Sequence, residues 1–222
     1  MNLAIFDIDG TLVDSRRIIH DAMLHAYDRC GLADPGYDRI RKVIGLGLRQ
    51  AFVALEPDAP DDVLAQLEAA YVEAFIILRE TQEGREPLYE GALDLLEELH
   101  RKGWKLGVAT GKSRRGVGHI LRIHGLERLF HASVCADDGP GKPDVFMVEH
   151  SLRVAGASRT RTLVIGDSTH DMAMARAAGV RAVGVCWGFA EAEELTLAGA
   201  DELHHDYPSL TRSLVAFGAA PR

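Results

Sequence analysis

Four short polar motifs hold the residues of this sequence that could do chemistry, and each of them contains or directly follows a run of apolar residues. The motifs are FDIDGT (residues 6–11), VATGKS (108–113), DDGPGKPD (137–144) and LVIGDSTHD (163–171). In an open α/β sheet, the carboxyl ends of the strands line the crevice that binds ligands. Polar residues that follow different strands can therefore converge there, although they are far apart in the sequence.

The first and last motifs each supply a pair of carboxylates, Asp7 with Asp9 and Asp167 with Asp171. Two acidic groups at the end of an apolar strand are costly unless a cation neutralises them. Each pair also has an ordinary structural explanation. The first could be a strand that runs into an Asp-Gly turn, and Asp171 could favour the positive end of a helix dipole. The residues alone leave these alternatives open.

The two middle motifs suit an anion. The hydroxyl of Thr110 and the backbone N–H of Gly111 stand at an expected helix entrance, which is a favourable place for a phosphate oxygen. Lys142 lies between a glycine and a proline and offers a point charge for an anion. The structural alternatives are a threonine that ends a strand while Ser113 caps the next helix, and a lysine in a solvated loop.

Five short apolar segments predict the strands that position these motifs. Each segment is nearly free of charge, as expected of strands with both faces covered by helices. Segments with apolar residues at helical spacing lie between several of them, such as Ala92, Leu95, Leu96 and Leu99. The alternation predicts an α/β fold built on a parallel sheet. The predicted strands are residues 3–6, 104–109, 132–136, 162–165 and 180–185.

Residues 15–82 interrupt this alternation, because helical patterns follow one another there with no strand between them. We interpret them as a helical insertion placed after the first strand. The polar segment TQEGREP at 81–87 is interpreted as the return linker. The prediction is a sheet domain formed by residues 1–14 and 83–222, with an all-helical domain at 15–82.

Composition excludes several classes of protein. The chain has 222 residues, 47% hydrophobic and 26% charged, which is an ordinary globular balance. Its net charge of −8, without any run rich in Lys or Arg, disfavours binding to nucleic acid. No uncharged run approaches the length of a membrane span, and the first ten residues lack the basic start of a secretory signal. Three distant cysteines without a CxxC pair suggest reduced thiols. We therefore expect a cytoplasmic protein that binds no membrane, as a monomer or homodimer.

The order Asp-x-Asp, Thr, Lys, Asp-x-x-x-Asp, each at a strand end, resembles the haloacid dehalogenase superfamily of phosphohydrolases. The resemblance spans essentially the whole chain, and the helical insertion is similar to the C1-type cap domain of that superfamily. It implies a Rossmann-like parallel sheet core with an inserted all-helical cap. The DxDGTLVDS start and the ADDGPGKP loop are most similar to phosphoglycolate phosphatase-like members. Val145 departs from the pattern, because many such members have proline there.

The resemblance implies a phosphatase mechanism. Asp7 would be the nucleophile that forms an aspartyl-phosphate, and Asp9 would be the acid and base. Thr110, Gly111 and Lys142 would hold the phosphoryl oxygens.

The same resemblance implies a Mg²⁺ ion, which would also relieve the repulsion between a carboxylate and a phosphate dianion. Its ligands would be Asp7, the backbone carbonyl of Asp9, and Asp167. Asp171 would bind through water or orient the other ligands.

A small phosphorylated metabolite is the expected substrate, and the helical insertion is expected to contact its leaving group. In the segment VIGLGLRQ, Gly45 and Gly47 permit close approach, and Arg49 could clamp a carboxylate or a second phosphate. Arg49 could equally open a solvated helix. Lys112 and Arg114 follow Thr110 and could also reach the leaving group.

Other functions fit parts of the pattern. A phosphomutase or a pyrophosphatase of the same fold would use the same groups. A dehalogenase would have no use for Asp9, since a departing halide needs no acid. A phospho-accepting receiver-like signalling domain also combines Asp, Thr and Lys, but it would be about half this length and would lack the insertion.

Overall fold

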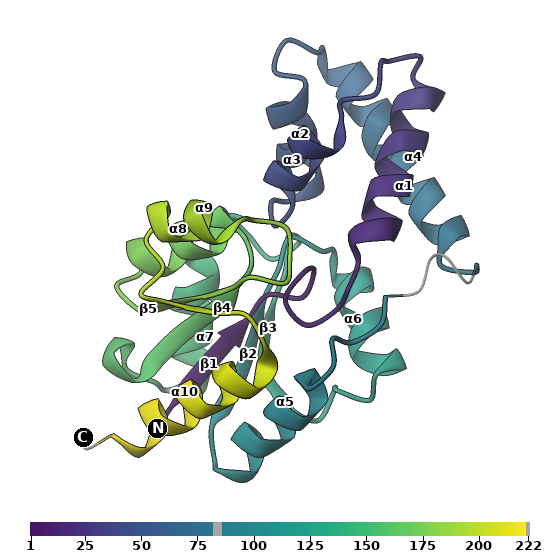
Figure 1. Ribbon diagram of the computed structural model, residues 1–222. Coiled ribbons are helices and arrows are strands. Elements are labelled where there is room, and N and C mark those ends of the chain that lie inside the picture. Colours follow the sequence, from purple (N-terminus) through teal and green to yellow (C-terminus); the bar gives the residue numbers. More distant parts are fainter. Residues whose placement is uncertain (82–85, 221–222) are drawn as a thin grey trace.

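The computed structural model describes residues 1–81 and 86–220. Six parallel strands form one sheet in the order β3-β2-β1-β4-β5-β6 (Figure 1). This confirms the predicted α/β fold with a Rossmann-like sheet. The strands are β1 (Leu3–Phe6), β2 (Lys105–Ala109), β3 (Phe130–Val134), β4 (Thr162–Gly166), β5 (Arg181–Val185) and β6 (Glu202–His204).

Helices cover both faces of the sheet, as the uncharged strands require. Alternate residues of β1 point to opposite sides: Ala4 and Phe6 pack with α5, α6 and α10, whereas Leu3 and Ile5 pack with α7, α8 and α9. These helices are α5 (Ala92–Arg101), α6 (Arg114–Ile123), α7 (Phe146–Ala155), α8 (Thr169–Ala177), α9 (Ala192–Leu197) and α10 (Tyr207–Ala219). A single 3₁₀ turn, Arg159–Arg161, precedes β4.

The helical insertion packs around a core of its own, with α1 lying along α4. It stands beyond the carboxyl ends of the strands, opposite the two chain termini (Figure 1). Its helices are α1 (Arg16–Arg29), α2 (Tyr37–Val43), α3 (Leu48–Leu55) and α4 (Asp61–Leu78). The predicted end of the insertion at residue 82, with most of the predicted linker, lies outside the described residues.

β2, β4 and β5 differ from their predicted ranges by one residue each, and two details of the sheet differ by more. β3 spans Phe130–Val134 instead of residues 132–136, because the residues after Val134 form a turn in which the backbone N–H of Cys135 donates to Asp138. β6 was not predicted, since its three residues Glu-Leu-His give no apolar run. Within the described residues, no helix is both long and apolar enough to cross a membrane.

Candidate active site

The ends of three neighbouring strands place the predicted residues side by side. β1 lies between β2 and β4, so Asp7, Thr110 and Asp167 follow adjacent strands at the same edge of the sheet. The ladder continues into the site, where the backbone N–H of Asp7 donates to the carbonyl of Ile165 at 3.0 Å. This edge is the point where the strand order reverses, the usual ligand crevice of an open α/β sheet.

Three buried carboxylates meet around one buried ammonium group. Oxygens of Asp7, Asp167 and Asp171 lie within 4.8 Å of one another. The Nζ atom of Lys142 lies 2.8 Å from Asp7 Oδ2 and 2.7 Å from Asp171 Oδ1, and its side chain is fully buried. Lys142 is thus not a solvated loop lysine, although its motif alone allowed that interpretation.

The electrostatics of this cluster favour an additional cation. Burial raises the pKa of Asp7 to about 7; Asp171 and Asp9 add to the effect, while Lys142 opposes it. Burial and the same acidic neighbourhood raise the pKa of Asp167 well above its ordinary value. Burial works against the charge of Lys142, but Asp171 and Asp7 outweigh it and raise the pKa of its ammonium group. Three carboxylates against one ammonium group form a set of hard oxygen donors that fits a divalent ion such as Mg²⁺.

Contacts that the sequence analysis did not predict hold Asp167 in place. Thr11 Oγ1 donates to Oδ1 at 2.7 Å, and the backbone N–H of Phe189 donates to Oδ2 at 2.9 Å. A Cβ atom at Gly10 or at Gly188 would overlap the Asp167 carboxyl group. The sequence pointed to some of these residues, because Gly10 and Thr11 belong to the FDIDGT motif.

Asp171 has both of the environments that its motif allowed. Its Oδ2 accepts hydrogen bonds from the backbone N–H and the hydroxyl of Ser168, at 3.2 and 2.6 Å, as part of the N-terminal cap of α8. Its Oδ1 faces Lys142 and the carboxylate cluster. The capping contacts hold the carboxyl group in one orientation, in which Oδ1 points toward Lys142 and the other two carboxylates.

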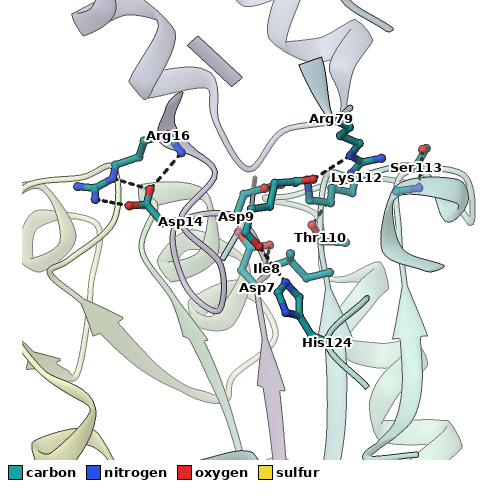
Figure 2. A network of polar contacts seen from close by, with 12 residues as sticks. Asp7, Ile8, Asp9, Asp14, Arg16, Arg79, Thr110, Lys112, Ser113 and His124 are labelled. Carbon is teal, nitrogen blue, oxygen red and sulfur yellow. Dashed lines mark hydrogen bonds and ion pairs between the residues drawn. The ribbon is translucent and has the colours of Figure 1, made fainter. Parts of the chain in front are cut away.

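A chain of ion pairs leads from Asp9 to the helical insertion (Figure 2). Lys112 Nζ lies 2.9 Å from Asp9 Oδ1 and 2.8 Å from Glu86 Oε1. Arg79, which ends α4, pairs with Glu86 Oε2 at 2.8 Å. Glu86 was missed because its segment reads as a polar linker, yet it is buried, and Lys112 and Arg79 lower its pKa despite that burial.

The loop before α3 contacts the VATGKS motif, which the sequence analysis expected to bind phosphate. The carbonyl of Leu46 lies so close to Gly111 that a Cβ atom there would overlap it. Gly45, with φ +97°, packs against Ser168, and Gly47 lies near Ala136. Thr110 is buried at this point, and its hydroxyl accepts a hydrogen bond from the backbone N–H of Lys112 at 3.3 Å. Ser113 also caps α6, by accepting from Gly116 at 3.2 Å.

Arg49 and Arg114 are not brought to the site. Arg49 pairs with Asp61 at 2.5 Å and with Glu68 at 2.8 Å, within the helical insertion. Arg114 pairs with Asp138, and its guanidinium group also donates to the carbonyl of Ser133. Both guanidinium groups are held by these acceptors, and neither contacts the carboxylate cluster.

A pocket of about 190 Å³ lies between the helical insertion and the sheet domain and reaches Asp9, Gly111 and Lys112. Most of its remaining lining comes from apolar side chains of α1, α4 and the segment 43–51. The position suits the leaving group of a phosphate ester whose phosphoryl group sits beside Asp7.

Comparisons with known proteins identify the family of this chain and agree with its fold. Residues 4–185 match the family described as haloacid dehalogenase-like hydrolase. The chain is 32% identical to "Phosphoglycolate phosphatase" from Agrobacterium fabrum, over 98% of this chain and 96% of that protein. It is 31% identical to "Pyrophosphatase PpaX" from Bacillus pumilus, over 88% of each chain. The crystal structure of a haloacid dehalogenase-like hydrolase from Bacteroides fragilis superposes with a TM-score of 0.85 at 27% identity, covering 94% of this chain and 99% of that one.

Proposed function

Because this chain belongs to the haloacid dehalogenase-like hydrolase family, we propose that it is a magnesium-dependent phosphatase that hydrolyses a small phosphate monoester. The observation that carries the proposal is the buried cluster of Asp7, Asp167 and Asp171 around Lys142 at the reversal point of the sheet. The residues proposed as the nucleophile, the ligands of a cation and a partner for phosphoryl oxygens lie there in one place.

The bound Mg²⁺ would lower the repulsion between the Asp7 carboxylate and the phosphate dianion and would polarise the phosphoryl group. Asp7, Asp167 and the backbone carbonyl of Asp9 would hold it, with Asp171 bound through water or orienting the ligands. Thr11 and the backbone of Phe189 would keep the Asp167 carboxylate in position through the hydrogen bonds described above.

A carboxylate oxygen of Asp7 would attack phosphorus, so that the Asp7–phosphorus bond forms while the ester oxygen leaves with the electron pair of its bond. Asp9 would give that oxygen a proton. In the second step of the reaction, Asp9 would take a proton from a water molecule. The water would attack phosphorus, and the Asp7–phosphorus bond would break to restore the Asp7 carboxylate. The hydroxyl of Thr110, the backbone N–H of Gly111 and the Lys142 ammonium group would bind the phosphoryl oxygens.

Asp9→Asn is expected to lower kcat by about 10²–10⁴-fold, because the amide can neither give nor accept the proton. With 4-nitrophenyl phosphate, whose alcohol leaves without a proton, the variant is expected to release a burst of one nitrophenolate per enzyme. Slow turnover then follows, because hydrolysis of the aspartyl-phosphate still needs Asp9 as a base. Stopped-flow absorbance measures both phases. An unchanged steady-state rate would contradict the role of Asp9.

A screen of phosphorylated metabolites with Mg²⁺, read out as inorganic phosphate, tests the proposal as a whole. The panel includes phosphoglycolate, sugar phosphates, nucleotides and pyrophosphate, since the relatives include a protein named as a pyrophosphatase. We expect phosphate from at least one monoester with a kcat/KM well above that for pyrophosphate. Isomerised sugar phosphate without free phosphate would instead indicate a mutase, and no product from any compound would contradict the proposal.

A further inference from the structure

The helical insertion lines the pocket mainly with apolar side chains, which limits the kind of leaving group that can bind there. Ile19 and Met23 come from α1, and the rings of Tyr71 and Phe75 from α4 lie 5.5 Å apart, centroid to centroid. The pocket's 190 Å³ compares with about 10–15 Å³ for a single water on the same scale. It therefore exceeds the needs of a two-carbon leaving group.

The rim of this wall leaves apolar surface exposed. Val72 and Ile76 line the pocket from α4, yet 47% and 37% of their surface remains accessible. Among the described residues, nothing covers this part of either side chain, and burial of apolar surface by a ligand is favourable. An apolar ligand would gain that contact, while a hydrated acid would not.

Of the three described cations that line the pocket, two are already paired with carboxylates of the protein and are not available for a carboxylate of the leaving group. Arg49 does not line it, and Arg79 is held by Glu86 with its guanidinium 4.7 Å above the Phe75 ring. Lys112 lies between Asp9 and Glu86. Within the described part of the chain, only Arg115 among these pocket-lining cations has no carboxylate partner, and it is exposed on α6.

We propose that the leaving group is an apolar alcohol or phenol of about the size of a ring, bound between α1 and α4, instead of a two-carbon hydroxy acid. This inference rests on the proposed phosphatase function. On this inference, substrate specificity is determined by four residues of α4: Tyr71, Val72, Phe75 and Ile76.

The first test compares kcat/KM for 2-naphthyl phosphate, hexyl phosphate and phosphoglycolate, with Mg²⁺ and phosphate release as the readout. Both apolar esters are expected to exceed phosphoglycolate by at least about tenfold, as a few methylene contacts in an apolar pocket allow. Phosphoglycolate as the equal or better substrate would overturn the inference and leave the phosphatase function standing. No phosphate from any of the three, together with none from the wider panel above, would overturn both.

The second test uses neighbouring residues as a matched pair. Ile76→Asn is expected to lower kcat/KM for 2-naphthyl phosphate about tenfold, mainly through KM, with phosphoglycolate changed less than twofold. Ile77→Asn is the control, because Ile77 is 55% exposed on the same helix and does not line the pocket. Val72→Asn should repeat the selective loss if Ile76→Asn folds poorly. Equal losses in the Ile76 and Ile77 variants, or equal losses on both substrates, would overturn the inference.

Discussion

Asp7→Asn is expected to reduce phosphate release by at least about 10⁴-fold, as loss of a catalytic nucleophile does in other hydrolases. The amide has no negative oxygen with which to attack phosphorus. The fold should persist, because the amide oxygen can still accept the hydrogen bond from the Ile8 backbone N–H, and Lys142 keeps its pair with Asp171. Phosphate release under saturating substrate measures the effect, and far-UV circular dichroism checks the fold.

Asp14→Asn is the matched control for this variant. Asp14 lies on the same segment but pairs with Arg16, and both side chains are partly exposed. We expect its kcat to stay within twofold of that of the unaltered protein, since exposed ion pairs contribute little. Substantial turnover by Asp7→Asn, or equal losses in the two variants, would remove Asp7 from the role of nucleophile.

Removal of divalent cations is the second change with a large expected effect. After dialysis against EDTA, activity toward any substrate should fall below about 1% and return when Mg²⁺ is added, because uncompensated carboxylates repel the incoming phosphate. Mg²⁺ should also raise the melting temperature, since a ligand that binds only the native state stabilises it.

The melting temperature separates a role in catalysis from a role in binding the ion. Asp167→Asn should lose most of the Mg²⁺-dependent rise, because it removes one of the three clustered carboxylates. The matched control is Asp201→Asn, which lies outside the cluster and should keep the rise. Full activity in EDTA, or an undiminished rise in the Asp167 variant, would contradict the proposed metal site.

The strands could be predicted because each one that is covered on both faces must be apolar and short. The strand order was not predicted; the structure shows that β1 lies between β2 and β4, which places Asp7, Thr110 and Asp167 together. β6 was not predicted because an edge strand of three residues, Glu-Leu-His, with a single apolar side chain gives no such run. The predicted range of β3 was displaced by two residues because the apolar run continues through Cys135 and Ala136, which lie in the turn after the strand.

Side-chain partners were harder to predict than positions. Glu86 lies in a segment that reads as solvated, and its burial depends on two cations from distant elements, Lys112 and Arg79. The pairing of Arg49 was not predicted either: its guanidinium contacts Asp61 and Glu68, two acidic residues of its own domain. Pairings of this kind depend on packing between elements, which spacing along one element does not reveal.

The hydrogen bond from Thr11 to Asp167 joins residues 156 positions apart, across the seam between β1 and β4. Synthesis produces Asp7, the proposed nucleophile, almost at once, but its acidic partner Asp167 is added only when about three quarters of the 222 residues have been joined. A nascent or truncated chain that ends before β4 thus contains Thr110, Gly111 and Lys142, the residues proposed to bind phosphate, but lacks Asp167 and Asp171 of the proposed metal site. Appearance of activity would therefore report that the last quarter of the chain, from β4 onward, has docked, so turnover can be used to follow the completion of folding.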